Sequence, residues 1–202
     1  MRYRVLEPPP HTVPSVFTRA LLDWLPWLEP LAVEALSERH RTALVDAARV
    51  KSPYSRLLAR DPDALRARTR TDKDIFYNPD AGLPQAEREL AAAATSRFNG
   101  CIYCASVHAR FSATYSKREA DVQRLLDEGV NADLGERWNT IVAASVALST
   151  TPITFGPQHV ERLRRAELDD LAIADVIHAA AFFNWANRLM LSLGEPAVAA
   201  GI

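Results

Sequence analysis

The chain contains only two cysteines, Cys101 and Cys104, which are separated by two residues, and His108 follows four positions after the second. A thiolate is the reactive form of cysteine, and a helix N-terminus or a neighbouring imidazole favours it by lowering the thiol pKa. On a helix that begins at Cys101, both sulfurs and the imidazole share one face. Residues three apart are also close enough for a disulfide. The spacing predicts a redox-active dithiol in which Cys104, nearer to His108, is the more acidic.

The same pattern has two other uses. A disulfide that closes so short a loop would restrain the unfolded chain by only about 2 kcal/mol, which argues against a structural bridge. The cysteines and His108 could also supply three zinc ligands, but the fourth would have to be a distant histidine or carboxylate, because the sequence holds no further cysteine. We expect a dithiol without metal or cofactor, and a zinc site or an inert buried pair are the alternatives.

A carboxylate earlier in the chain falls into register with His108. Asn99 and Gly100 mark a helix end, and the helices before and after them are expected to fold back as a hairpin. Glu89 lies ten residues before Asn99, and His108 lies eight residues after Gly100. At about 1.5 Å of rise per residue the two side chains differ in height by only about 3 Å. We expect Glu89 to orient the imidazole, directly or through water, and to take part in proton transfer.

These side chains depend on helices. Helical periodicity runs through the whole chain and alternating β-branched stretches are nearly absent, so the predicted fold is all-α. Pro8, Pro9 and Pro10 make the first dozen residues an extended arm that lies over this subunit or a neighbour. Ser116 and Glu119 form a predicted capping box. The expected helices cover an interrupted region 15–50 with Trp24 and Trp27, then 62–77, 84–99, 101–115, 116–129, 134–149 and 169–193.

The composition indicates one globular domain with a substantial core. Of 202 residues, 48% are apolar, and no change of composition separates two units, so we expect a single domain, 1–202. Within it, 1–80 form a helical layer without a recognisable motif, and 81–202 form the layer with the cysteines. The 24 basic and 25 acidic side chains leave a net charge of −1, which argues against a nucleic-acid partner. With no apolar run long enough for a bilayer and no leader-like N-terminus, a cytoplasmic protein without membrane contact is expected.

The pattern Glu89-x11-Cys101-x2-Cys104-x3-His108, with Asn99-Gly100 before the first cysteine, resembles the alkylhydroperoxidase AhpD-like branch of the carboxymuconolactone decarboxylase family. The segment FFNWANRL (182–189) is similar to the closing helix of that family. The resemblance implies a helical bundle of the AhpD-like type that assembles as a homo-oligomer.

The resemblance also implies the roles of the site residues. Cys104 would attack the peroxide, Cys101 would resolve the product as a disulfide, and Glu89 with His108 would form the proton relay. Tyr103 stands between the cysteines, where the best-known peroxidase members have a histidine, and is a further candidate relay.

The expected function is therefore that of a cysteine-dependent hydroperoxide reductase without haem, flavin or metal. It would be recycled by an external dithiol, either a lipoyl-type or a thioredoxin-like partner. Two alternatives remain from the same residues. One is a carboxy-lyase like the decarboxylases of the family, in which the cysteines are incidental. The other is a non-catalytic module that senses redox state or binds zinc.

Overall fold

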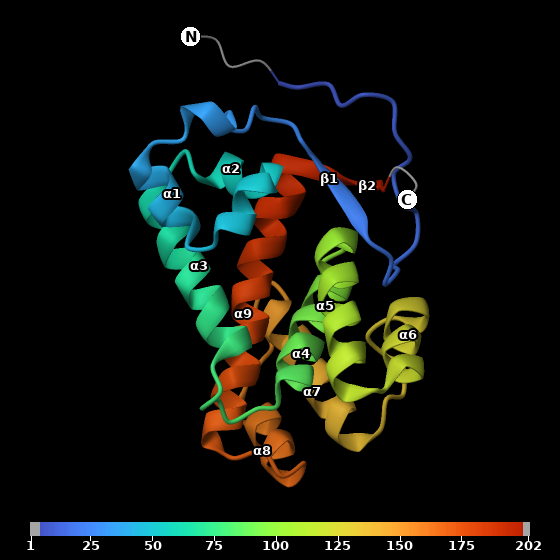
Figure 1. Cartoon of the computed structure of the whole chain (residues 1–202). Coiled ribbons are helices and arrows are strands. Elements are labelled where there is room, and N and C mark those ends of the chain that lie inside the picture. Colours follow the sequence, from blue (N-terminus) through green and yellow to red (C-terminus); the bar gives the residue numbers. More distant parts are fainter. Residues whose placement is uncertain (1–4, 200–202) are drawn as a thin grey trace.

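The computed structural model describes residues 5–199, and its architecture is the expected all-α bundle with one small addition, a pair of short strands (Figure 1). The helices are α1 (Glu38–Leu44), α2 (Pro53–Leu58), α3 (Pro62–Tyr77), α4 (Gln85–Phe98), α5 (Ile102–Ser116), α6 (Glu119–Glu128), α7 (Glu136–Ser149), α8 (Pro157–Arg165) and α9 (Asp170–Leu193). Strands β1 (Leu22–Pro26) and β2 (Gly194–Val198) pair with each other, and short 3₁₀ turns cover Val33–Ala35 and Ala47–Lys51.

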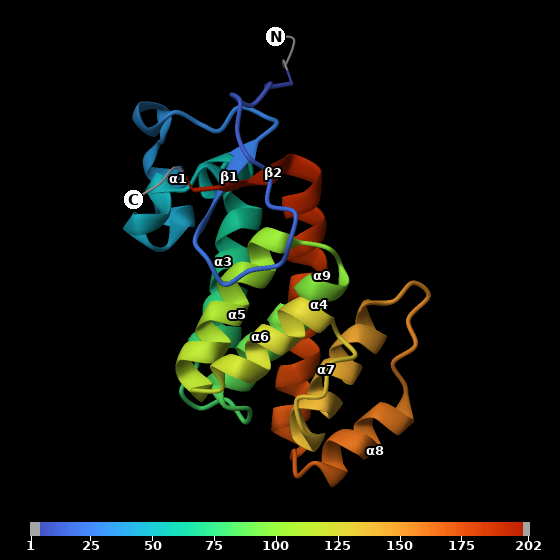
Figure 2. The same ribbon diagram turned by 90° about the vertical axis from the view of Figure 1, so that its right-hand side faces the viewer.

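Helix α4 lies at the centre of the bundle and packs against α5, α7 and α9 (Figures 1 and 2). Leu90 and the four alanines that follow it, residues 91–94, are all completely buried. The methyl side chains of the alanines let the neighbouring helices approach α4 closely, so this helix forms the middle of a close-packed interior. A second, smaller core forms around α1 and α3 and includes Leu44 and Leu65.

Several helix ends follow the expected local signals. The Asp61 side chain accepts a hydrogen bond from the Ala64 amide and begins α3, as the Asp-Pro pair predicts. Helix α4 ends at Phe98, and Gly100 takes a positive φ of 78°, a conformation that glycine adopts without strain. Helix α8 was not among the expected elements. No helix of residues 5–199 combines the length and apolar character needed to span a membrane.

The interrupted helical region expected at 15–50 is wrong over its first half. Trp24 lies instead in β1, which runs antiparallel to β2 and places Trp24 opposite Pro196. Pro26 and Pro30 lack the N–H that a helix needs and disfavour helical backbone before them, whereas a strand at the edge of a two-stranded sheet tolerates proline. Only α1 and the 3₁₀ turns remain helical in this part of the chain.

The proline-rich arm lies over its own chain, one of the two positions expected for it. The Leu6 amide donates to the Trp27 carbonyl at 2.8 Å, and the Val198 amide donates to the Thr12 carbonyl at 2.8 Å. The arm and the strand pair therefore join the two ends of the described chain on one side of the bundle (Figure 1). That side is the one where α5 begins.

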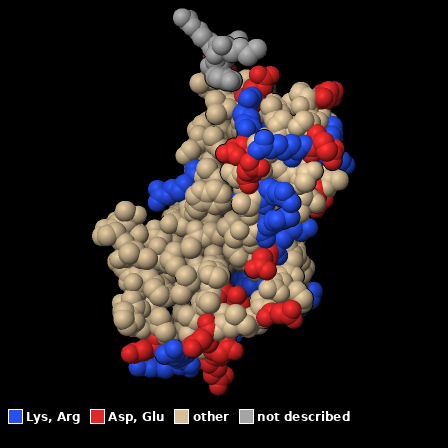
Figure 3. Space-filling view, turned by 90° about the vertical axis from the view of Figure 1, so that its left-hand side faces the viewer, with Lys and Arg blue, Asp and Glu red and all other residues tan. Residues whose placement is uncertain are grey.

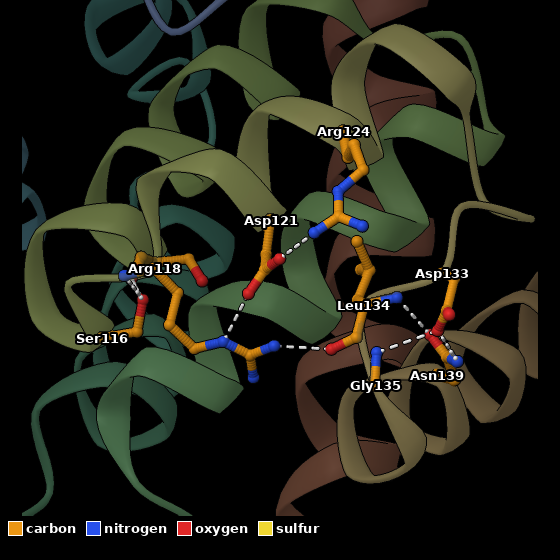
Figure 4. Close-up of polar contacts among 9 residues, drawn as sticks. Ser116, Arg118, Asp121, Arg124, Asp133, Leu134, Gly135 and Asn139 are labelled. Atoms are coloured by element: carbon orange, nitrogen blue, oxygen red, sulfur yellow. Dashed lines mark hydrogen bonds and ion pairs between the residues drawn. The ribbon is translucent and has the colours of Figure 1, made fainter.

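The capping box expected from Ser116 does not form. The Ser116 hydroxyl accepts from the Arg118 amide at 3.1 Å, so it closes the turn after α5, and α6 begins without a side-chain cap (Figure 4). The Arg118 guanidinium donates to the Asp121 carboxylate at 2.6 Å and to the Leu134 carbonyl at 2.5 Å, and it lies 3.8 Å from the centre of the Trp138 ring. One arginine thus ties the start of α6 to α7, a long-range connection that no sequence spacing indicated.

Candidate active site

The two cysteines lie where the α4–α5 hairpin turns. Cys101 is the N-cap residue of α5, and its amide donates to the Ser96 carbonyl of α4 at 2.9 Å. The left-handed conformation of Gly100 reverses the chain so that α5 runs back along α4. This geometry places Cys104 in the first turn of α5 and His108 one turn further on, opposite the middle of α4.

The expected contact between Glu89 and His108 is present. Glu89 Oε2 lies 2.5 Å from His108 Nδ1, and both residues are buried, with 1% and 9% of their surfaces exposed. Because the carboxylate holds Nδ1, the other ring nitrogen, Nε2, is the one available for proton exchange. Phe183 fixes the ring from α9, with 4.0 Å between the ring centres, and Phe76 packs from α3 at 5.3 Å.

Both cysteines are free thiols and both are buried. Hydrogen bonds from the Cys104 thiol and from the Cys104 backbone amide hold the pKa of Cys101 below its ordinary value. The same hydrogen bond to Cys101, together with burial, raises the pKa of Cys104 well above the usual value. The expectation that Cys104 is the more acidic thiol is therefore wrong. The lowered pKa belongs to Cys101, at the N-terminus of the helix, and not to Cys104, which lies nearer the imidazole.

Asn187 of α9 is a polar neighbour of both thiols that the cysteine pattern did not reveal. Its side chain is completely buried within hydrogen-bonding reach of both sulfurs, where it contributes to the lowered pKa of Cys101 and opposes the raised pKa of Cys104. Asn187 Nδ2 donates to Ser96 Oγ at 3.0 Å, and its Oδ1 accepts from Asn99 at 3.0 Å. The sequence signal was a single amide on the apolar face of FFNWANRL, since a buried amide in a helix needs partners.

The two sulfurs face different cavities. Cys104 lines a cavity of about 390 Å³ together with Glu89 and His108, whereas Cys101 lines a separate cavity of about 190 Å³ beneath β1 and β2. Tyr103 lines both, so it forms part of the wall between them. Burial, followed by the nearby Cys104 charge, raises the pKa of Tyr103 and keeps it a neutral phenol. No group of three or more His, Cys, Asp and Glu side chains that could hold a metal ion occurs within residues 5–199.

The layer without a motif supplies the opposite wall of the larger cavity. Tyr54 of α2 and Arg68 of α3 line it, together with Arg49, Asp72 and Phe76. Burial raises the pKa of Tyr54 to about 12, although the Arg68 charge acts against this shift. No spacing rule pointed to these residues, because they reach the cysteines only through the packing of α2 and α3 onto the hairpin and α9.

The fold is that of the AhpD-like proteins. A peroxidase-related protein with an alkylhydroperoxidase AhpD core from Ralstonia eutropha JMP134 superposes with a TM-score of 0.68 at 24% identity, over 81% of this chain and 87% of that chain. A peroxidase-related protein from Silicibacter sp. TM1040 superposes with a TM-score of 0.62 at 23% identity, over 70% of this chain and 74% of that one.

The debrominase Bmp8 shares the fold as well, with a TM-score of 0.62 at 19% identity over 81% of this chain and 88% of that chain. Residues 62–147, from α3 to α7, match the sequence model of the carboxymuconolactone decarboxylase family. No individually curated protein matches the sequence significantly.

The Asn187→Ala variant tests the electrostatics of the thiol pair. Loss of the amide removes a hydrogen bond to each sulfur, so the pKa of Cys101 should rise, and alkylation by iodoacetamide should require higher pH. The loss should also destabilise the fold by about 1–3 kcal/mol, since the Ser96 hydroxyl and the Asn99 amide each lose a buried partner.

Asn184→Ala is the matched control. Asn184 is partly exposed and also accepts from Asn99, at 3.1 Å, but it is not a hydrogen-bond partner of either sulfur. An unchanged alkylation profile in Asn187→Ala, or an equal shift in both variants, would contradict the role assigned to Asn187.

Proposed function

We propose that this chain is a thiol-dependent hydroperoxide reductase in which Cys104 and Cys101 cycle between dithiol and disulfide. The observation that carries the proposal is the buried Glu89–His108 pair, which shares a cavity with one thiol of an adjacent pair. The fold of AhpD-like peroxidase-related proteins supports the same class of chemistry.

In the first step the Cys104 proton passes to Cys101 along the hydrogen bond between the thiols, and the Cys104 thiolate attacks the terminal peroxide oxygen. The O–O bond breaks and the leaving alkoxide takes a proton from His108 Nε2, which yields an alcohol and a sulfenic acid on Cys104. Buried Glu89 stabilises the protonated imidazole, which is recharged from solvent.

In the second step the Cys101 sulfur attacks the Cys104 sulfenic acid. An S–S bond forms, the S–O bond breaks and water leaves, so atoms and charge balance. The helix terminus and the hydrogen bonds that lower the Cys101 pKa suit it to this resolving role. Tyr103, a neutral phenol between the cavities, is positioned to donate hydrogen bonds but not to act as a base near neutral pH.

An external dithiol must then reduce the disulfide. We infer that a lipoyl-type or thioredoxin-like reductant attacks Cys101 and forms a mixed disulfide there. The separate cavity beside Cys101 supports this order, because a reductant could reach that sulfur without entering the cavity of the peroxide. This assignment agrees with a chain that acts inside the cytoplasm, where dithiol reductants are maintained.

The two layers together form the site, and we propose that 1–202 act as a single domain. Tyr54 and Arg68 of the first layer and Cys104 and His108 of the second line the same cavity. Neither layer alone would enclose the reacting sulfur.

The family match also fits a carboxy-lyase, in which the cysteines would not change oxidation state.

The cysteine variants distinguish a hydroperoxide reductase from a carboxy-lyase. Wild type treated with one equivalent of hydroperoxide should lose two thiols and about 2 Da of mass. Cys104→Ser should abolish peroxide consumption, and Cys101→Ser should still react once and stop at the sulfenic acid, as followed by stopped-flow thiol oxidation. Native-rate consumption by Cys104→Ser with loss in Cys101→Ser would reverse the two roles, and no thiol loss in wild type would sink the proposal.

Glu89→Gln tests the relay. The amide cannot stabilise a protonated imidazole as a carboxylate does, so the first-step rate constant should fall by roughly 10²-fold, within the range of general acid–base catalysis. The matched control is Glu87→Gln, two residues earlier on α4, whose carboxylate pairs with Arg137 instead. Equal rates for the Glu89 variant and wild type would exclude the relay.

A homo-oligomer is also proposed, on the evidence of α9. Leu171, His178 and Trp185 repeat every seven residues along this helix and are all exposed, Trp185 to 46%. Figure 3 shows one face of the molecule with a wide area that carries no charged side chain. Exposed apolar side chains such as Leu171 and Trp185 are typical of subunit contacts. Light scattering should give a mass above one chain for wild type and a smaller mass for Trp185→Glu, and a monomeric wild type would refute the proposal.

A further inference from the structure

Two polar side chains in the larger cavity each have a buried atom whose hydrogen-bonding capacity is unused. The Arg68 side chain is only 10% exposed, and Tyr54 is largely buried beside it. Arg68 Nε and the Tyr54 hydroxyl have no partner of normal hydrogen-bond geometry among the residues that the structure describes, although the two side chains lie close enough to interact with each other. Buried polar groups are nearly always paired, so two unpaired ones that line the same cavity indicate a ligand.

Among the cations that line the cavity, Arg68 is the one that has no carboxylate of residues 5–199 within hydrogen-bond distance. Asp72 binds Arg49 at 2.9 Å and approaches Arg68 only to 3.8 Å, while the Glu89 carboxylate is engaged by His108. The Arg68 guanidinium is held in place by aromatic rings, with its central carbon 5.8 Å from the centre of the Tyr54 ring. Its planar fork of donors is therefore preorganised for a planar anion.

The remainder of the cavity is apolar. Phe76, Val107, Phe111 and Phe183 contribute to its lining, together with Arg68 and Cys104. A cavity of about 390 Å³ with this lining suits a hydrocarbon body rather than hydrogen peroxide alone.

We propose that Arg68 and Tyr54 bind the carboxylate of an apolar organic acid whose reactive group lies at Cys104. The inference rests on the proposed function and names its substrate class as hydroperoxides that carry a carboxylate. One guanidinium matches the single negative charge of a carboxylate, and the Tyr54 hydroxyl donates the additional hydrogen bond. Arg68 and Tyr54 bind the carboxylate and so determine specificity, and the Arg68 charge also acts on Cys104, whose pKa it lowers.

The first experiment measures binding and needs no turnover. Octanoate and its neutral counterpart octanamide are titrated into reduced wild-type protein by calorimetry. Octanoate should bind at least about tenfold more tightly, and Arg68→Met should remove that preference, since a charged hydrogen bond is worth a tenfold effect or more. Arg70→Met is the matched control because Arg70 is an exposed residue of the same helix. Equal binding of both probes, or equal loss in both variants, would overturn the proposal.

The Tyr54→Phe variant distinguishes a loss of binding from a loss of stability. The Tyr54 hydroxyl has no partner of normal hydrogen-bond geometry among the described residues, so its loss should leave the melting temperature unchanged or higher while octanoate binding weakens. Weakened binding together with a lowered melting temperature would count against a direct contact, as would unchanged binding.

The second experiment compares cumene hydroperoxide with its para-carboxy derivative. The acid should have the lower KM at similar kcat, and Arg68→Met should raise the KM of the acid alone by about tenfold or more. If neither peroxide is consumed while Arg68-dependent octanoate binding persists, the peroxidase function fails and the carboxylate site stands. If both are consumed with equal KM values, the carboxylate site fails and the peroxidase function stands.

Discussion

The contact between Glu89 and His108 is the constraint on which the site depends. An ionised carboxylate buried in the middle of a helical bundle is strongly unfavourable unless a hydrogen-bonding partner meets it, and the imidazole at 2.5 Å is that partner. The pairing is possible in only one register of the hairpin, because a shift by one residue would rotate either side chain about 100° away. The alanine-rich surface of α4 permits the close approach, and Gly100 permits the reversal. With that register set, Cys104 necessarily lies at the same cavity as the imidazole.

The two neighbouring sulfurs lie in different surroundings. Cys101 lies at the N-terminus of α5, where hydrogen bonds from Cys104 and Asn187 lower its pKa, and it lines the small cavity under the strands. Cys104 lies at the larger cavity, with the imidazole on one side and the cation and phenol of the first layer on the other. A dithiol whose members share one proton can place negative charge on either sulfur with little rearrangement of the surrounding chain. In the proposed cycle, this arrangement would let oxidation begin at Cys104 and reduction begin at Cys101.

Local signals predicted much of this structure. The Asp-Pro start of α3, the Asn-Gly end of α4 and the height match of Glu89 with His108 all depend on residues near one another in the chain, where spacing and geometry are directly related. The strand pairing of Trp24 with Pro196 was missed because its partners lie at opposite ends of the sequence. The order of the thiol pKa values was missed because it depends on which sulfur donates to the other. Tyr54 and Arg68 carry no signal at all, since only tertiary packing brings them to the cavity.

The pairing of β1 with β2 also affects the order in which the chain folds. Most contacts in the bundle join helices that are close in sequence, whereas β1 and β2 bring together the two ends of the described chain and enclose a very long loop. Contacts between residues so far apart in the sequence are expected to form late in folding, because the cost of closing the loop must be met first. The strand pair covers the cavity of Cys101, whereas the cavity of Cys104 is lined mainly by helices. A local opening of this pair would therefore expose Cys101 and leave the surroundings of Cys104 in place.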